Sequence, residues 1–556
     1  MLRQSPFYYS PIPLLPFADI INSMKALCVV YGGRLAPEAF EKALPGGEGK
    51  ESAFSLALAA AAAFPGVQKT VFLSVDGQGC PVLPDGIEVK KRSSWTRKIL
   101  LEELSILSSG YDLVYFAWAD CPLLDAGLAG ALAERHTRYG AEYSYADGWP
   151  YGFAPEILAP ATTGILAKLA EGDDAHEKCD VERDALFQVI QKDINAFDIE
   201  TEISPVDLRP YRLSLTADSK RNLLLLSRWM EAGLRSASDA EKLINEKPGL
   251  LRTLPAYFNI QVTGACPQAC SICPWPVYGG GIPVTERKDH LPVDAFEGLL
   301  GKIEGFAGDA VIGISLWGEP SLHPQADELI GMVLSRPALS LVVETSGIGW
   351  KEDGLKALAE AASQAAPRKN HIAPLSWIVS LDAHEGERYR QVRGPGFSEA
   401  CSAARTLFSL FPRDTYVQAV RVRDFEDDIE HFYRAWKEEP GVPAARRKDG
   451  SHVIIQKYDD FSGVLPKLQA SDLSPVKRRP CWHIQRDMNI LLDGRALCCR
   501  EDLASLKGNG DKAWGNVFTE DLAVVWERGA ALYMEHCNAE YRGICGHCDE
   551  YYTYNF

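Results

Sequence analysis

Three cysteines lie close together near the middle of the chain, in the segment Cys266-Pro-Gln-Ala-Cys270-Ser-Ile-Cys273. The segment directly follows a strand-like run at 257–262, and with 14 cysteines in 556 residues such a preset spacing arises by chance in roughly 1% of chains. Three thiolates at this spacing can hold three irons of a cubane and leave the fourth iron open to a ligand. The alternative is a structural zinc ion, which requires a fourth ligand, and His290 is the nearest later candidate.

The other cysteines fall into two sets. Fourteen cysteines are too few for a disulfide scaffold in a chain of this length, and grouped thiols in a reducing compartment indicate metal binding. Five cysteines are scattered singly, namely Cys28, Cys80, Cys121, Cys179 and Cys401. Six crowd the end of the chain, namely Cys481, Cys498, Cys499, Cys537, Cys545 and Cys548.

The composition excludes several classes of protein. Lys plus Arg is 58 and Asp plus Glu is 75, so the net charge is −17, and the basic clusters at 90–92, 446–448 and 477–479 are short. Binding to nucleic acid in general or to a membrane surface is therefore not expected. The longest nearly apolar stretch, 53–64, is shorter than the roughly 20 residues that cross a bilayer. Residues 1–23 lack the features of a secretory signal, so we expect a cytoplasmic protein, with Met24 as a candidate natural start.

The elements that must position the cysteines follow two repeating patterns of strand and helix. After an N-terminal extension at 1–23, the region 24–235 alternates strand-like runs at 27–31, 70–74 and 112–118 with helix-like runs at 52–64 and 126–139. Such alternation predicts a doubly wound α/β domain with a parallel sheet. A polar helical stretch at 219–246 overlaps a linker that we place at 236–254.

From 255 to 470 we expect six strand-then-helix units, with strands near 257–262, 310–316, 339–345, 376–381, 415–420 and 452–458. Eight such units close a full barrel, so six predict an open, partial barrel whose chemistry lies at the carboxyl ends of the strands. The last region, 471–556, has short strands, turns at 493–494 and 508–510, and the six crowded cysteines. A small region with so little core usually requires a metal to stay folded.

The cysteine loop resembles the CxxxCxxC signature of the radical S-adenosylmethionine superfamily, whose fold is a partial (βα)6 barrel. The segment 315–320, Ser-Leu-Trp-Gly-Glu-Pro, resembles the family's GGEP motif, which implies that Gly318 and Glu319 receive the methionyl ammonium. Ser380 and Asp382 end the fourth strand, where the family contacts the ribose and methionine portions of the cofactor. Arg393 with Gly394 resembles the RG pair that steadies its carboxylate. Taken singly, these could be an ordinary turn and a surface arginine.

One position departs from the family pattern. Ile272 stands where the family usually has an aromatic residue, so adenine stacking would be weaker there while backbone contacts remain. The resemblance implies a reduced 4Fe-4S cluster that passes one electron to bound S-adenosylmethionine, and a 5'-deoxyadenosyl radical that abstracts hydrogen from the substrate. It also implies an electron donor such as flavodoxin or ferredoxin. The cofactor supplies the chemistry, and the protein supplies orientation and a dry cavity.

The C-terminal cysteines resemble the SPASM or shorter Twitch extension of radical enzymes, including Gly515-Asn516 and Trp526 between them. We prefer four of them as ligands of one auxiliary 4Fe-4S cluster, namely Cys481, Cys499, Cys545 and Cys548. Four thiolates suit electron transfer, whereas three leave a site for substrate. Cys498 and Cys537 are then additional cysteines, and His547 is expected not to be a ligand. A four-cysteine zinc ribbon remains the alternative, because spacing alone does not exclude it.

The first domain resembles a sugar-activating cytidylyltransferase, on the segments 25–34, 118–125 and 213–218. In that family aspartates at the positions of Asp120 and Asp218 hold Mg²⁺ against triphosphate oxygens, which suits an ion that prefers oxygen ligands. The phosphate loop is less similar, because neither 32–34 nor 46–50 reproduces the family's arginine-rich loop or a Walker A sequence. The two aspartates could instead be helix caps. Both a catalytic transferase and a non-catalytic module that recognises sugar nucleotides stay open.

The whole arrangement is similar to the spiro-SPASM group. It predicts an α/β protein with a nucleotidyltransferase-like domain, a radical S-adenosylmethionine barrel and a small iron-sulfur domain. The expected activity is that of an oxidoreductase or transferase-type radical enzyme on a small or carbohydrate-linked molecule. A maturase that modifies a peptide or protein is the near alternative. Two other hypotheses are a nucleotidyltransferase acting on sugars and a non-enzymatic iron-sulfur or zinc protein.

Overall fold

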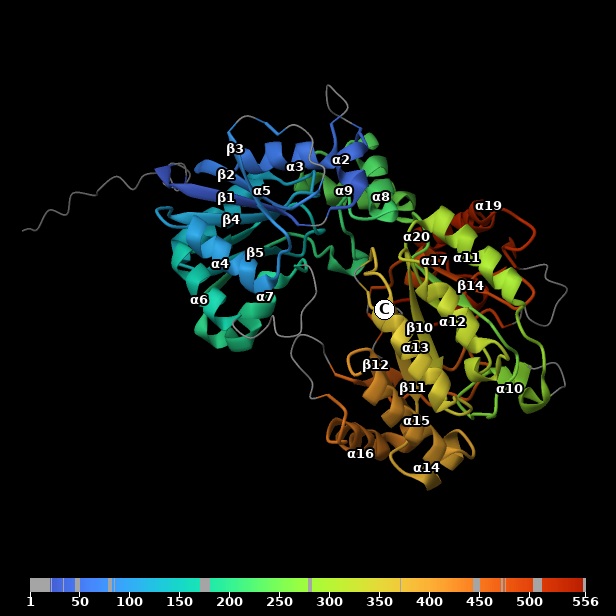
Figure 1. Cartoon of the computed structure of the whole chain (residues 1–556). Helices are drawn as coiled ribbons and strands as arrows, with labels where there is room; N and C mark the ends of the chain where they lie inside the picture. Colours follow the sequence, from blue (N-terminus) through green and yellow to red (C-terminus); the bar gives the residue numbers. More distant parts are fainter. Residues whose placement is uncertain are drawn as a thin grey trace, which may run out of the picture. The chain divides into compact units, whose positions relative to one another are not determined.

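The computed structural model describes residues 21, 23–33, 35–45, 51–78, 83–84, 86–170, 181–278, 283–370, 372–443, 451–471, 474–475, 477–503 and 513–553. Several predicted features lie outside the described residues: most of the N-terminal extension, Cys80, Cys179, Arg34, and the segments 46–50, 446–448 and 508–510. The chain divides into two compact units, Met1–Asp218 with Leu225–Glu246 and Ser219–Leu224 with Lys247–Phe556 (Figure 1). The predicted domain boundaries stay predictions, and each unit is described by itself.

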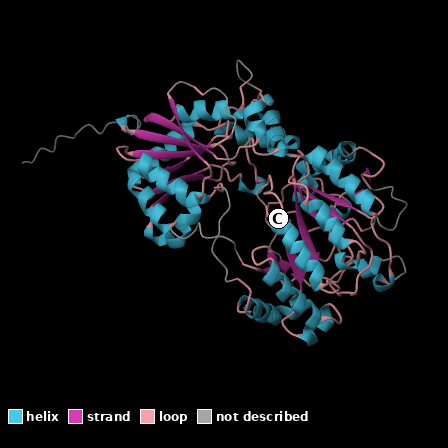
Figure 2. Ribbon diagram, viewed as in Figure 1, coloured by secondary structure: helices cyan, strands magenta, loops and turns pink. Residues whose placement is uncertain are grey.

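The first unit is built on a seven-stranded mixed sheet with helices packed on it (Figure 2). The strand order is β3-β2-β1-β4-β6-β5-β7. Neighbours are parallel from β3 to β4 and between β5 and β7, while β6 is antiparallel to both of its partners. The strands are β1 Ala26–Gly32, β2 Val67–Val75, β3 Ile87–Arg92, β4 Leu113–Trp118, β5 Tyr143–Asp147, β6 Glu156–Leu158 and β7 Ile199–Ile203.

The sequence pattern explains these elements. Every residue of β1 and β4 is buried, as is typical of strands covered on both faces, and the predicted strand and helix runs are present. Helix α5, Ala126–Tyr139, begins where the Asp125 carboxylate accepts a hydrogen bond from Leu128 N, and it ends at Gly140 with φ +63°. The other helices are α2 Pro37–Glu41, α3 Ala53–Ala62, α4 Arg97–Leu107, α6 Pro160–Leu169 and α7 Ala185–Ile190.

The helical stretch predicted at 219–246 is interrupted. It forms α8, Lys220–Glu231, and α9, Ala240–Glu246, instead of one continuous helix. Gly233 lies between them with φ +110°, a conformation that glycine adopts without the steric cost of a side chain. The polar pattern was compatible with one helix, but the glycine ends the first one.

A buried histidine makes the first unit sensitive to acid. His136 in α5 is 4% exposed, and its Nδ1 lies 2.8 Å from Ser144 Oγ in β5. Burial lowers the pKa of His136 to about 4, so the folded unit holds it neutral while the unfolded chain protonates near its ordinary pKa of about 6.5. The neutral histidine therefore contributes fully to the free energy of unfolding above pH ~6.5. This contribution is lost as the pH falls toward 4, and the loss is about 3 kcal/mol at most.

We expect hydrogen exchange of the α5 and β5 amides to accelerate between pH 6.5 and pH 4, after correction for the intrinsic pH dependence of exchange. A His136→Gln variant should show a flatter pH dependence of this protection, because glutamine does not titrate. An unchanged slope in that variant would contradict the assignment to His136.

The second unit carries a nine-stranded sheet in the order β13-β12-β11-β10-β9-β8-β14-β15-β16. Strands β8 to β13 are parallel, β14 runs parallel to β8, and β15 and β16 complete the edge in antiparallel fashion. The parallel strands are β8 Tyr257–Ile260, β9 Ala310–Gly313, β10 Leu339–Thr345, β11 Leu375–Ser380, β12 Thr415–Arg421 and β13 Val453–Lys457. The additional strands are β14 Asp487–Ile490, β15 Arg495–Leu497 and β16 Gly515–Asn516.

All six predicted strands of this region are present, and the sheet is open as predicted, with β13 at one end. Helices follow the first five strands in the chain (Figure 1). In α11 the buried positions Phe296, Leu299, Leu300, Ile303 and Ala307 follow helical spacing, so one face packs inward. The main helices after the strands are α11 Val293–Ala307, α12 Ala326–Leu334, α13 Glu352–Gln364, α14 Gly386–Val392, α15 Phe397–Leu410 and α16 Glu426–Lys437.

The C-terminal part of the second unit is made of short elements. The predicted turn at Asp493-Gly494 joins β14 to β15, with Gly494 at φ +83°. Its helices are α17 Trp482–Arg486, α19 Leu522–Glu527 and α20 Ala530–Cys537. In the part of the chain that the structure describes, no helix combines the length and the apolar character needed to cross a membrane.

Candidate active site

A cavity of about 550 Å³ lies in the second unit, where the carboxyl ends of the parallel strands meet. All nine residues predicted for the central cluster and for S-adenosylmethionine line it. They are Cys266, Cys270, Ile272, Cys273, Gly318, Glu319, Ser380, Asp382 and Arg393. Segments more than 100 residues apart in the sequence therefore contribute to one site.

The backbone of the cysteine loop is held at both ends. Cys266 N donates to Val284 O at 3.0 Å, and Ser271 N donates to Val392 O at 2.9 Å, so the loop is tied to the region around Arg393. Burial raises the pKa of the Cys266 thiol to about 12 and raises the pKa of Cys273 as well, while Arg393 opposes both shifts. These thiols therefore hold their protons until a metal displaces them.

The three thiols are not arranged around a single zinc ion in this structure. Tetrahedral zinc with Zn–S bonds near 2.3 Å brings sulfurs within about 3.8 Å of one another. Among the described residues, no three cysteine sulfurs lie within 4.8 Å of one another. His290 does not line the cavity, and its Nδ1 instead lies 3.0 Å from Thr263 Oγ1. The candidate fourth ligand of a zinc site is thus engaged elsewhere.

Glu319 is a buried carboxylate that the chain holds firmly. Its Oε2 accepts a hydrogen bond from Ser346 N at 2.7 Å, and its Oε1 accepts one from the Thr345 hydroxyl. Its own backbone N donates to Ala265 O at 2.7 Å, directly before the first cysteine. Burial raises the pKa of Glu319, and these hydrogen bonds oppose the shift. Each carboxylate oxygen can accept more than one hydrogen bond, so Glu319 can also receive an ammonium group.

The backbone at position 318 passes so close to a neighbouring segment that a residue with a side chain would not fit there. It has φ +95°, and a Cβ at this position would lie 2.1 Å from Thr263 O and 3.1 Å from Ala265 O. The preceding Trp317 also has positive φ, and its ring stacks on that of Trp275 at 6.2 Å between centroids. The absence of a side chain at Gly318 therefore lets the motif lie directly against the segment between β8 and the cysteines.

Asp382 and Arg393 form an ion pair beside the cysteine loop. Arg393 Nη1 donates to Asp382 Oδ2, and Asp382 Oδ1 accepts from Val420 N at 2.7 Å. Arg393 Nε donates to Gln268 Oε1 at 3.2 Å, within the cysteine loop itself. Although burial opposes it, the charges of Cys270 and Asp382 raise the pKa of Arg393. The arginine thus provides a fixed positive charge next to Cys270.

The structure adds polar residues that the sequence analysis did not identify. Glu344 Oε1 accepts hydrogen bonds from Ser380 Oγ at 3.1 Å and from Gln418 Nε2 at 2.9 Å, and all three side chains line the cavity. Asn259 also lines it, is 9% exposed, and its Oδ1 has no hydrogen-bond partner among the described residues. Asn259, Glu344 and Gln418 are polar residues inside strands that are otherwise largely apolar, a signal that could have identified them.

The four preferred cysteines of the second group line another, small cavity. Cys481, Cys499, Cys545 and Cys548 lie around it, together with Cys498, whereas Cys537 does not line it. Cys499 Sγ accepts from Glu501 N at 3.2 Å, and Cys548 Sγ accepts from Glu550 N at 3.3 Å. Backbone N–H groups directed at sulfur stabilise thiolates, so this donor set fits a metal or an iron-sulfur cluster. His547 is exposed and does not line the cavity.

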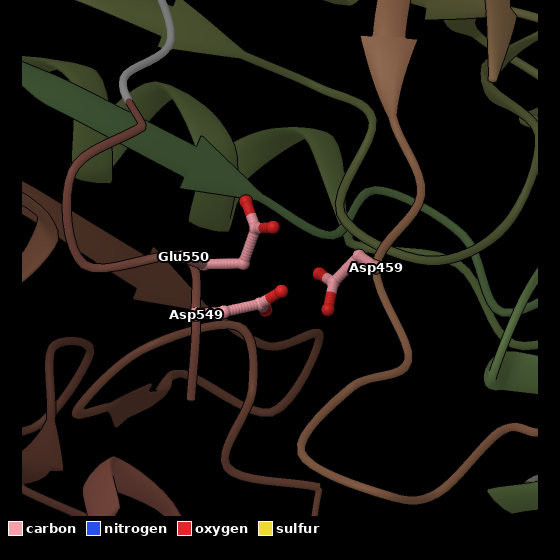
Figure 3. A group of neighbouring side chains, drawn as sticks. All are labelled: Asp459, Asp549 and Glu550. Atoms are coloured by element: carbon pink, nitrogen blue, oxygen red, sulfur yellow. The ribbon is translucent and has the colours of Figure 1, made fainter. Parts of the chain in front are cut away.

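A cluster of charged side chains contributes residues to both cavities. The carboxylates of Asp459, Asp549 and Glu550 face one another, with one oxygen of each within 4.8 Å of the others (Figure 3). Lys457 Nζ lies 2.9 Å from Asp549 Oδ2 and also pairs with Glu550, while Arg500 Nη2 lies 3.3 Å from Asp459 Oδ2. Two cations of the chain therefore pair with these three carboxylates, and Arg500 lines both cavities.

The two aspartates predicted to hold Mg²⁺ come together in the first unit, but around an arginine. Arg183 Nη1 and Nη2 donate to Asp120 Oδ1 and Oδ2 at 2.9 and 2.6 Å, and Nη2 also donates to Asp218 Oδ2 at 2.8 Å. The oxygens that a metal would require are engaged with a guanidinium, so these residues do not fit the ion as they stand.

No protein-family model matches the chain, and three curated proteins are similar to it, among them the following two. An uncharacterized protein of Treponema pallidum (strain Nichols) is 37% identical over 380 residues, which cover 67% of this chain and 98% of that protein. The GTP 3',8-cyclase of Stenotrophomonas maltophilia (strain R551-3) is 29% identical over 172 residues, which cover 29% of this chain and 44% of the cyclase.

Two solved structures each resemble a part of the chain. BtrN in complex with AdoMet and 2-DOIA has a TM-score of 0.33 and 14% identity, and the match covers 54% of this chain and 92% of BtrN. A cytidylyltransferase from Leptospira borgpetersenii serovar Hardjo-bovis (strain JB197) has a TM-score of 0.32 and 16% identity, over 41% of this chain and 95% of that one. Both likenesses are remote, so the functional assignment depends on the residues of the site.

Proposed function

We propose that this chain, which belongs to the same family as the uncharacterized protein of Treponema pallidum, is a radical S-adenosylmethionine enzyme. One observation carries the proposal. The three thiols of Cys266, Cys270 and Cys273 share one cavity with Glu319 and Arg393, at the carboxyl ends of six parallel strands. The local similarity to GTP 3',8-cyclase supports an enzymatic function for part of the chain.

Different residues of the cavity would bind different parts of the cluster and of S-adenosylmethionine. The three thiolates would hold a 4Fe-4S cluster, which when reduced and bound to S-adenosylmethionine supplies a 5'-deoxyadenosyl radical for hydrogen abstraction. Glu319 would receive the methionyl ammonium, and Arg393, fixed by Asp382 and Gln268, would attract its carboxylate. Ile272 packs with Trp317 against the apolar cluster that contains Tyr458 and Phe461, which restricts water at this side of the cavity.

The polar lining of the cavity favours a polar substrate. Asn259, Glu344 and Gln418 present hydrogen-bonding groups to it, and Lys457 and Arg500, which pair with the acidic cluster, line it as well. We therefore keep a small or carbohydrate-linked substrate as the preferred class over a peptide. Cys481, Cys499, Cys545 and Cys548 would hold one auxiliary 4Fe-4S cluster for electron transfer, as in the SPASM and Twitch domains that this region resembles. A flavodoxin or ferredoxin would supply the electrons.

Anaerobic reconstitution of the full chain tests this function. We expect about eight irons and eight sulfides per chain, for two 4Fe-4S clusters. After reduction with dithionite, addition of S-adenosylmethionine should change the EPR spectrum, and 5'-deoxyadenosine should accumulate. Stoichiometric zinc without iron would contradict both cluster assignments. Iron without any spectral response to S-adenosylmethionine would contradict the central site alone.

A further inference from the structure

The structure assigns to Arg183 the place between Asp120 and Asp218 that a divalent cation would occupy in a metal-dependent nucleotidyltransferase. We propose that the first unit works without a metal and is not a nucleotidyltransferase, whatever the second unit catalyses. The inference is independent of the radical function, because all of the residues that carry it belong to the first unit.

The geometry is that of a bidentate ion pair with a third contact. Arg183 Nη1 and Nη2 lie 2.9 and 2.6 Å from the two oxygens of Asp120, so both oxygens of this carboxylate are engaged. The same Nη2 lies 2.8 Å from Asp218 Oδ2. The planar fork of arginine matches a carboxylate in this way, and it does not lose its charge in proteins.

Two aromatic rings hold the guanidinium in place. Its central carbon lies 4.6 Å from the ring centroid of Trp118 and 5.3 Å from that of Tyr151. Trp118 is the last residue of β4, two positions before Asp120. The end of the same strand therefore positions both the ring and the carboxylate that contact Arg183. Cation–π contacts of this kind add to the ion pair when the charge is shielded from water. Both the carboxylates and the aromatic rings therefore fix the position of the arginine.

Burial makes the exchange of this arginine for a metal unfavourable. The Asp120 side chain is 2% exposed and that of Arg183 is 28% exposed. Although burial opposes it, the charge of Asp120 raises the pKa of Arg183 well above its ordinary value. Magnesium requires near-octahedral oxygen ligands at about 2.1 Å and gives up its water reluctantly. To bind here it would have to displace a charged group that already engages both oxygens of Asp120 and one oxygen of Asp218.

Removing the arginine should convert the pair into a weak metal site. In full-length Arg183→Ala protein, we expect the calorimetric transition of the first unit to fall by roughly 5 °C, because Asp120 loses its buried partner. Added Mg²⁺ should restore part of this loss and should bind at one ion per chain by isothermal titration calorimetry. The wild-type transition should not move with Mg²⁺, and pyrophosphate should not be released from CTP.

Two further variants separate this proposal from simple misfolding. Arg183→Ala combined with Asp120→Asn should lose the response to Mg²⁺, and Arg183→Lys should keep a positive charge and show little response. If Arg183→Ala does not fold, titration of the wild-type chain with Mg²⁺ still tests the proposal. Binding of one Mg²⁺ by the wild-type chain that Asp120→Asn abolishes would overturn the proposal, as would turnover of CTP by the wild type.

Discussion

A Cys270→Ala variant is expected to lose 5'-deoxyadenosine formation by more than about 100-fold. Loss of even an indirect partner of a metal ligand costs 10- to 100-fold in affinity or activity, and Cys270 is a predicted direct ligand. Its sulfur lies 3.9 Å from Arg393 O and 4.0 Å from Gln268 Oε1, between the loop and the arginine. The variant should contain about four irons per chain, those of the C-terminal cluster, and the measurement is iron content together with turnover.

Cys401→Ala is the matched control. Cys401 is a single cysteine in α15, buried among helix residues, and it lines neither of the two cavities described above. We expect this variant to keep both clusters and normal turnover. Equal loss of iron in the two variants would indicate general destabilisation. Full iron content and full activity in Cys270→Ala would show that the central thiols do not form the site.

The central motifs could be found from the sequence because each lies just after a strand. Parallel strands bring their carboxyl ends to one edge, so residues after β8, β9 and β11 converge even though the chain separates them widely. This argument places the cysteine loop, Glu319 and Asp382 without knowledge of side-chain contacts. The structure confirms that these residues share one cavity. Their roles as ligands stay predictions.

The polar cavity residues that lie inside the strands were harder to predict from the sequence. Asn259, Glu344 and Gln418 each occupy one position in a strand whose other residues are largely apolar, and a period of two then sets which face they share. Such a residue is expected to be exposed unless the strand is known to be covered on both faces. Only the observed arrangement, in which Gln418 and Ser380 both donate to Glu344, shows that they face a common cavity.

Arg183 could not be predicted from the sequence as the partner of the two aspartates. It lies 63 positions after Asp120 and 35 before Asp218, in a segment that has no motif of its own. The sequence pattern therefore assigned the two acids to a metal, because the segments 118–125 and 213–218 that contain them resemble a metal-dependent family. Long-range ion pairs depend on how loops pack, which neither periodicity nor composition reports.

A Glu319→Gln variant is expected to bind S-adenosylmethionine roughly 10- to 100-fold more weakly while it keeps its central cluster. Glutamine preserves the size of the side chain but removes its charge, and a hydrogen bond to a charged group contributes about 1.5–3 kcal/mol. It also places an amide group where both carboxylate oxygens now accept from Thr345 and Ser346. The measurements are iron content, the dissociation constant from the EPR change on titration, and 5'-deoxyadenosine yield.

Glu352→Gln provides the comparison, because Glu352 lies at the exposed start of α13 and pairs only with Lys356 among the described residues. This variant should bind S-adenosylmethionine as the wild type does. The effect at Glu319 separates ligand binding from cluster assembly, since Cys270→Ala removes iron and Glu319→Gln should not. If Glu319→Gln bound S-adenosylmethionine normally, the buried carboxylate would be a structural support of the strand-end loop, and the ammonium site would lie elsewhere in the cavity.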